Sequence, residues 1–172
     1  MAYSDTMSAK WNMAVGDLSS DEKGSGARDN GYKQPLDLIP VSVWRNNWRH
    51  DILNHPQGIE ITEMLYGLQR WQEGETAMLD QMMVGVELGG AVDVFSYGAT
   101  KYAEWNWAKG MRWSVPLGCA LRHVLAMLEG EALDPESGEP HLNHVYCNVI
   151  MLQYFARHYP DGDDRPIFKA EQ

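Results

Sequence analysis

The chain has 172 residues, a length typical of one domain that can bury a sizeable core. Its formal net charge is −10, which disfavours DNA or RNA polymers as partners, because these polyanions need basic surfaces. No basic segment precedes an apolar run at the start, and no apolar stretch reaches membrane-spanning length, so we expect a cytoplasmic protein without a membrane partner. Cys119 and Cys147 each lie in an apolar helical pattern, which is typical of buried thiols in a reducing compartment.

The composition predicts three regions. Residues 1–25 mix Ser, Asp, Gly and Lys without a lasting period, which is typical of a flexible N-terminal arm. Residues 26–160 show mostly helical periodicity and weak strand signals, so we expect a single all-α domain. Residues 161–172 are polar and read as a C-terminal tail.

The stretch 24–40 is rich in glycine and turn residues and contains Arg28, Asn30 and Lys33. Such a segment can lie across a pocket and offer two cations and an amide to a ligand. The alternative, which the residue types alone favour, is a connecting loop with solvated cations. In the following stretch, 41–75, a helical stripe runs from Pro56 to Gly74, and its tryptophans suit helix packing or an oligomer surface.

Residues 76–107 are helical again, with a break near Gly89 and Gly90. The end of this stretch brings together a cation, aromatic rings and an amide: Lys101, Tyr102, Asn106 and Trp107. Together they can hold a phosphate and stack a base. The alternative is a helix end whose aromatic side chains pack into the core.

The helix expected at 116–129 has two different faces at 100° per residue. One face carries leucine and valine, and the other carries Cys119, Arg122, His123, Ala126 and Glu129. A solvated face usually carries Lys, Glu and Gln, so small residues between functional groups favour the floor of a crevice.

A second helix, expected at 140–158, places His141, His144 and Asn148 on one face at spacings of three and four residues. That face continues with apolar residues, so the three polar side chains should be buried and need partners. A metal, a ligand or hydrogen bonds within the core would each satisfy them.

Between these two helices lies an acidic connector with Glu129, Glu131, Asp134, Glu136 and Glu139. Carboxylates are the ligands preferred by Mg²⁺ and Mn²⁺. Held near cations, such ions can neutralise a polyphosphate and activate water, so the pattern favours metal-assisted phosphate chemistry. A solvated acidic loop is the alternative.

The sequence lacks a GxxxxGK[ST] loop, a GxSxG elbow and an HExxH motif. Two rival functions remain. One is a zinc- or iron-dependent phosphohydrolase that uses His123, His141 and His144. The other is a non-catalytic nucleotide-binding protein whose helices only dock a partner.

Three blocks, GARDNGYKQPLDLIP, GATKYAEWNWAKGMRWS and ALRHVLAMLEGEALDPESGEPHLNHVYCN, resemble the phage dATP/dGTP diphosphohydrolase (MazZ-like) family. That family is similar to the MazG-like all-α NTP pyrophosphohydrolases, so the resemblance implies a helical bundle. It also implies Mg²⁺- or Mn²⁺-dependent hydrolysis of a purine dNTP to dNMP and pyrophosphate, with dGTP preferred and dATP as the other substrate. In phages with 2-aminoadenine genomes, the dGMP product feeds synthesis of that nucleotide in the host cytoplasm.

The resemblance further implies a homo-oligomer, dimer or tetramer, with sites near subunit contacts that the 41–75 region can supply. The E-x-x-E pair by which MazG-like enzymes bind metal is missing here, since Arg122, His123 and Ala126 occupy the equivalent helix. The metal ligands expected instead are Glu129, Glu131, Asp134 and Glu136. The expected catalytic residues are Lys101, Arg122, His123, Glu131 and Asp134. Those expected to bind substrate are Arg28, Asn30, Lys33, Lys101, Tyr102, Asn106, Trp107, His144 and Asn148.

Overall fold

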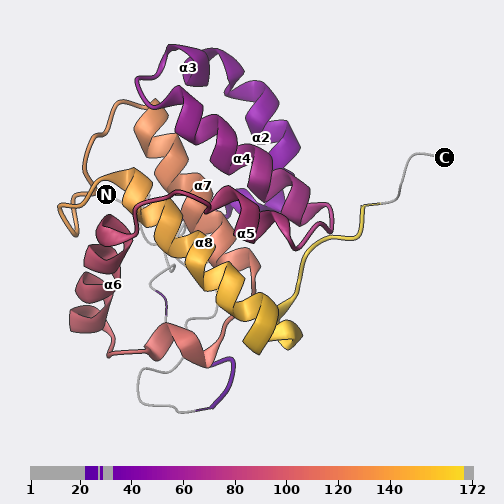
Figure 1. Ribbon diagram of the computed structural model, residues 1–172, viewed down its shortest axis with the longest axis vertical. Coiled ribbons are helices and arrows are strands. Elements are labelled where there is room, and N and C mark those ends of the chain that lie inside the picture. The colour runs from indigo at the N-terminus through magenta and orange to yellow at the C-terminus, as the bar shows by residue number, and fades with distance from the viewer. Residues whose placement is uncertain (1–21, 27, 29–32, 169–172) are drawn as a thin grey trace, which may run out of the picture.

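A computed structural model describes residues 22–26, 28 and 33–168. Over these residues the chain is helical without a strand, which confirms the all-α prediction (Figure 1). The predicted arm lies almost entirely outside the described residues. The elements are η1 (Leu36–Leu38), α2 (Val41–Asn47), α3 (Arg49–Asn54), α4 (Gly58–Gln72), α5 (Met78–Met82), α6 (Gly89–Lys101), η2 (Asn106–Lys109), α7 (Ser114–Leu128), α8 (His141–His158) and η3 (Pro160–Gly162).

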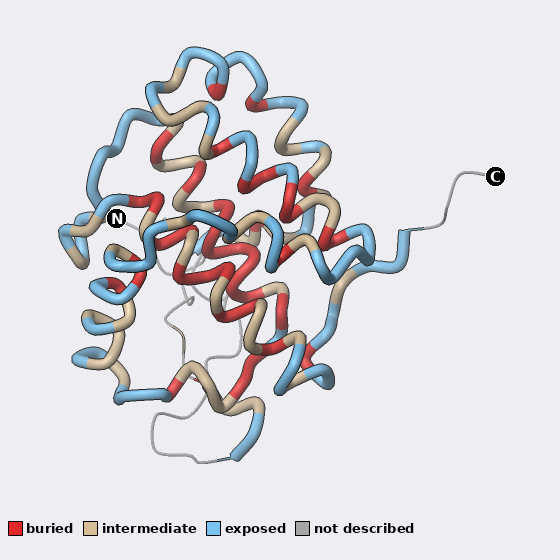
Figure 2. The backbone as a smooth tube through the Cα atoms, viewed as in Figure 1, coloured by how far each residue is buried: buried red, intermediate tan, exposed pale blue. Residues whose placement is uncertain are grey.

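Helices α7 and α8 lie side by side through the middle of the fold and are joined by the acidic connector, residues 129–140 (Figure 1). Leu121 and Val124 of α7 and Val145, Leu152 and Phe155 of α8 are all buried. Their spacing of three and seven residues gives each helix one apolar stripe, and these stripes form much of the buried interior in Figure 2. The more polar face of α7 is therefore directed away from this contact, whereas His141, His144 and Asn148 continue the stripe of α8 toward its N-terminus.

Helices α2, α3 and α4 pack together on one flank of this pair (Figure 1). Helix α4 follows Pro56, ends before Gly74 and buries its predicted stripe, which includes Ile61, Leu65 and Trp71. Trp44 and Trp48 of the same region stack with ring centroids 4.9 Å apart, and Trp48 is buried. The tryptophans of this region thus contribute to the chain's own core, and a subunit contact here stays a prediction.

Helix α6 begins at Gly89, where the sequence predicts a break, and it packs against α8. A β-carbon at Gly90 would lie 2.3 Å from the side-chain amide of Asn143 in α8, so a larger residue there would require this side chain to shift. The close approach at the start of α6 fixes one end of that helix against α8. Within the described part of the chain, every helix is too short or too polar to cross a bilayer.

The C-terminal segment packs onto α4 and the start of α7. The Arg165 guanidinium lies 5.1 Å from the ring centroid of Trp71 and 5.0 Å from that of Trp113. Its Nη1 donates to the Trp71 carbonyl at 2.7 Å, and its Nη2 lies 2.7 Å from Asp163 Oδ2. Residues 160–165 are thus tied to the helices, although most of them fall in the stretch read from sequence as a polar tail.

Substitution of Gly110 tests the packing between η2 and the end of α8. Gly110 has a φ of +94°, and a β-carbon there would lie 2.6 Å from the ring of Tyr159. Gly110→Ala should therefore lower the free energy of unfolding by at least about 2 kcal/mol. Gly98→Ala is the control, because the position is helical and a β-carbon meets no atom within 4 Å. That change should stabilise the protein by about 0.5–1 kcal/mol in urea unfolding. Equal stabilities for the two variants would contradict the packing described.

Candidate functional site

A cavity of about 860 Å³ lies between α6, η2, α7, α8 and the acidic connector. It collects nearly all of the residues singled out from the sequence: Arg28, Lys33, Lys101, Tyr102, Asn106, Trp107, Arg122, His123, Glu131, Asp134, Glu136, His144 and Asn148. Asn30 lies outside the described residues. Glu129 is exposed and lies outside the cavity lining.

Helix periodicity explains this convergence. Cys119, Arg122, His123 and Ala126 share the face of α7 that turns away from the leucine stripe, and all four line the cavity. Glu129 would continue that face, but α7 ends at Leu128 and Gly130 has a φ of +90°. Glu129 is the last residue before this turn, its N–H still donates to the Leu125 carbonyl at 2.9 Å, and its side chain is exposed outside the cavity lining.

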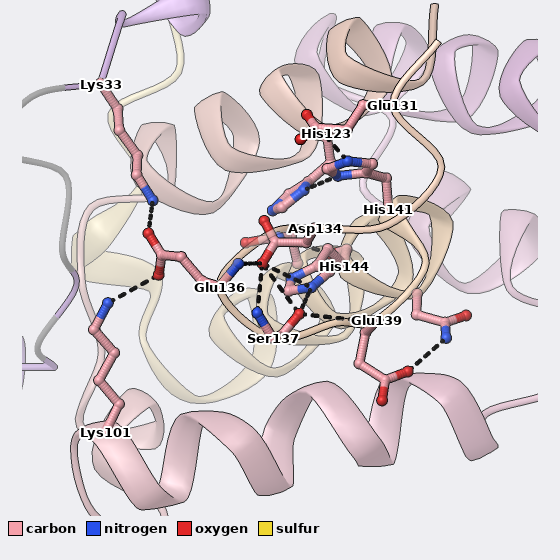
Figure 3. Close-up of polar contacts among 12 residues, drawn as sticks. Lys33, Lys101, His123, Glu131, Asp134, Glu136, Ser137, Glu139, His141 and His144 are labelled. Atoms are coloured by element: carbon pink, nitrogen blue, oxygen red, sulfur yellow. Dashed lines mark hydrogen bonds and ion pairs between the residues drawn. The ribbon is translucent and has the colours of Figure 1, made fainter.

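Three histidines that line the cavity, His123, His141 and His144, lie close together (Figure 3). Nδ1 of His123 lies 2.9 Å from Nδ1 of His141, and the His123 ring stacks on His144 with centroids 4.2 Å apart. His141 is only 2% exposed, and its Nε2 has no hydrogen-bond partner among the described residues. The Oε2 of Glu131 lies 3.4 Å from that Nε2.

This crowding disfavours a charge on the imidazoles of His123 and His144. Burial, together with the neighbouring His144 and His141 rings, lowers the pKa of His123 to about 2. Burial also lowers the pKa of His144, although Asp134 partly opposes the change. At neutral pH His123 is therefore a neutral ring that can accept a hydrogen bond or ligate a metal, and not a cation for phosphate.

Asp134 organises the acidic connector (Figure 3). Its Oδ1 accepts hydrogen bonds from the Ser137 N–H at 2.9 Å, the Ser137 hydroxyl at 3.1 Å and the Glu136 N–H at 3.1 Å. Burial opposes ionisation of Asp134, but these donors and the nearby His144 hold its pKa below the usual value. Ser137 Oγ also lies 2.8 Å from His144 Nε2. The connector is thus an ordered loop joined to α8.

Glu136 lies between two lysines at the rim of the cavity (Figure 3). Its Oε2 is 3.1 Å from Lys101 Nζ, and its Oε1 is 3.7 Å from Lys33 Nζ. The two lysines belong to segments far apart in the sequence, at the end of α6 and ahead of η1. A bound anion can take the place of the Glu136 carboxylate, because partly exposed ion pairs of this kind contribute little stability.

Two arginines enter the cavity wall from opposite directions. Arg28 donates through Nη2 to Asn148 Oδ1 and through Nε to Cys119 Sγ at 3.4 Å. Arg122 donates to the Gln34 carbonyl and to Cys119 Sγ, both at 2.9 Å. These contacts attach Arg28 and Gln34 to α7 and α8.

The other wall of the cavity is aromatic. The Trp107 ring lies 5.0 Å from Phe95 and 6.1 Å from Trp105 between centroids. Trp105 is 70% exposed although it lines the cavity, and its φ is +60°, an unusual value for a bulky residue. The sequence reasoning missed Phe95, Trp105 and Ser137 as site residues. The density of aromatic rings in 102–107 is the signal that could have included Trp105.

One group of side chains has the donors of a metal site. One ligand atom each of His123, Asp134 and His141 lies within 4.8 Å of the other two. Two imidazole nitrogens and a carboxylate oxygen are a common donor set for divalent ions. The carboxylates of Glu131 and Glu136 line the same cavity.

Thiol labelling tests the electrostatics of the cavity. Burial opposes ionisation of Cys119, but Arg28 and Arg122 bring its pKa below the usual value, whereas burial raises the pKa of Cys147 to about 12. Both thiols line the cavity and both are buried. Limited alkylation by iodoacetamide at about pH 7.5 should therefore modify Cys119 well before Cys147, because the thiolate is the nucleophile. Peptide mass spectrometry measures the order, with Cys119→Ser as the control. Equal labelling would contradict the described charge environment.

Comparison with known proteins adds to this geometry. A family model described as "dATP/dGTP diphosphohydrolase, N-terminal" matches residues 69–165, which is more than half of the chain. The matched range contains α6, α7, the connector and α8, and so most of the cavity. No curated protein and no solved structure matches the chain. The family match confirms the resemblance seen in the sequence blocks: the chain belongs to the dATP/dGTP diphosphohydrolase N-terminal family.

Proposed function

We propose that this protein hydrolyses purine deoxynucleoside triphosphates, with dGTP preferred and dATP as the other substrate, to dNMP and pyrophosphate with the help of Mg²⁺ or Mn²⁺. The observation that carries the proposal is the composition of the cavity. Cations, carboxylates and aromatic rings line one space of about 860 Å³, which lies within the range of sites for small ligands. A nucleoside triphosphate needs all three kinds of group.

The lining suggests how the nucleotide lies. Lys33 and Lys101 at the rim and Arg122 on α7 bind the phosphates, which displace the Glu136 carboxylate from the two lysines. The base stacks against the aromatic wall formed by Tyr102, Trp105 and Trp107. Asn106 and Asn148, which also line the cavity, supply amide groups for the sugar or base.

The proposed reaction is a substitution at the α-phosphorus. A water molecule attacks that atom, the bond from it to the bridging oxygen breaks, and pyrophosphate departs with the electron pair. The Glu131 carboxylate, which lines the cavity beside His141, takes the proton lost by the water. The basic side chains stabilise the charge that develops on the leaving group.

The donor set of the cavity fits a divalent ion. Glu131, Asp134 and Glu136 supply carboxylate oxygens, and His123 and His141 supply imidazole nitrogens. A bound ion neutralises phosphate charge and lowers the pKa of a water molecule. Glu129, exposed beyond the end of α7, would have to move to contribute.

In the cytoplasm of a phage-infected host, the proposed product dGMP serves as the precursor for synthesis of the 2-aminoadenine nucleotide of the phage. The resemblance to MazG-like enzymes supports a dimer or tetramer. Size-exclusion chromatography with light scattering tests the assembly separately from the activity.

Product analysis tests the reaction. Incubation with each dNTP and NTP plus Mg²⁺ or Mn²⁺ should yield dNMP and pyrophosphate, fastest with dGTP, as resolved by chromatography. Release of intact triphosphate would instead indicate a triphosphohydrolase, and binding without turnover would indicate a nucleotide-binding protein.

Asp134→Asn tests the site assignment. The amide oxygen can still accept hydrogen bonds from Ser137 and Glu136, so the fold should persist. The loss of the negative charge should lower kcat about 100-fold or more. Glu139→Gln is the matched control, because this connector carboxylate lies outside the cavity lining and should leave turnover unchanged. Wild-type turnover in the folded Asp134→Asn variant would disprove the assignment.

A further inference from the structure

We infer that His123, Asp134 and His141 form a mixed nitrogen–oxygen metal site that binds a first-row transition ion such as Mn²⁺, Co²⁺ or Zn²⁺ in preference to Mg²⁺. The inference specifies the metal of the cavity described above. Its catalytic use rests on the proposed function, whereas binding of the ion is a separate property that can be measured without nucleotide.

The three ligands come together from three segments. His123 lies on α7, Asp134 on the connector and His141 at the first residue of α8. One ligand atom from each lies within 4.8 Å of the others. The two Nδ1 atoms of the histidines are 2.9 Å apart. Adjacent ligands of an octahedral ion with bonds of about 2.1 Å are separated by about 3.0 Å, so the two nitrogens already have the spacing of neighbouring ligands.

The residues around these ligands hold them in orientation. Glu131 Oε2 lies 3.4 Å from Nε2 of His141, the nitrogen that does not face His123. Metal-ligating histidines usually donate from their second nitrogen to a carboxylate or carbonyl, and Glu131 lies beside this nitrogen without forming that hydrogen bond here. The Ser137 N–H and hydroxyl hold Oδ1 of Asp134. His144 stacks on His123 and contacts Ser137, so it supports both the histidine and the loop.

The chemistry of the donors sets the preference for the ion. Imidazole nitrogen suits Zn²⁺, Fe²⁺ and Ni²⁺, and the affinity of a mixed nitrogen–oxygen site rises from Mn²⁺ through Fe²⁺ to Co²⁺, whereas Mg²⁺ prefers oxygen ligands and retains several waters. His141 is almost fully buried, which limits the water that a Mg²⁺ ion would need on that side. Glu136, the next carboxylate of the connector, is paired with two lysines at the rim.

The competing interpretation is a pair of neutral histidines that only share a hydrogen bond within the protein interior. A bond between two Nδ1 atoms is possible when one ring donates and the other accepts. Under this interpretation, transition ions would bind no more tightly than Mg²⁺, and changes at His123 or His141 would affect stability alone. The two interpretations therefore differ in metal selectivity.

Equilibrium dialysis of the metal-stripped full chain tests the selectivity. With Co²⁺ and a hundredfold excess of Mg²⁺, we expect one Co²⁺ per chain by elemental analysis, with visible absorption bands of a protein-bound ion. His123→Gln and His141→Gln should weaken Co²⁺ binding at least tenfold. His158→Gln is the matched control, since this histidine lies exposed at the far end of α8 and should bind as the wild type does. Displacement of Co²⁺ by Mg²⁺, or unchanged binding in both variants, would overturn the inference.

A measurement on the wild type covers the case in which the variants fail to fold. Electron spin echo spectra of the Mn²⁺-loaded protein should show coupling to imidazole nitrogen, and spectra with water and carboxylate couplings alone would refute the site. Selective Co²⁺ binding without dNTP hydrolysis would refute the proposed function and leave the metal site standing. Hydrolysis that Mg²⁺ alone supports, with no selective Co²⁺ binding, would refute the metal site and leave the proposed function standing.

Discussion

The structure depends on the contact between α7 and α8. Leu121 and Val124 on one helix and Val145 and Leu152 on the other are buried together, and the loss of any of these side chains would cost about 2–5 kcal/mol. The same contact orients the opposite faces. A rotation of either helix by one residue, 100°, would carry His123 or His141 out of the cavity and expose an apolar residue in its place. Hydrophobic burial thus fixes the relative positions of the polar groups.

Local periodicity made a large part of this arrangement predictable. The boundaries expected at 116–129 and 140–158 differ by only one or two residues from those of α7 and α8, because apolar spacing and flanking prolines mark both helices. The polar groups could also be predicted, since Cys119 and His123 lie opposite a leucine stripe and Asn148 lies on a stripe that is otherwise apolar. Gly89 and Gly90 also marked the start of α6, where Gly90 lies close to the side chain of Asn143.

Contacts between distant segments could not be predicted in the same way. The sequence shows acids in the connector, but only the fold shows that Glu136 meets Lys33 and Lys101 whereas Glu131 lies beside His141. The expected role of Glu129 assumed that the cavity extends to the end of α7, but this side chain is exposed outside the cavity lining. Trp105 lines the cavity because of a positive φ that no sequence period reports. Pairings of this kind are set by loop closure and tertiary packing.

Arg165, the last residue of the range matched by the family model, contacts residues near the start of that range. The match ends at this residue, and its guanidinium lies against Trp71 of α4 and Trp113 ahead of α7. The matched range begins at 69, two positions before Trp71. The Arg165 guanidinium, by stacking on Trp71, therefore brings the two ends of the matched range into contact. The matched region is not a complete core by itself, because Val41, Ile61 and Leu65, which precede it, are fully buried against it.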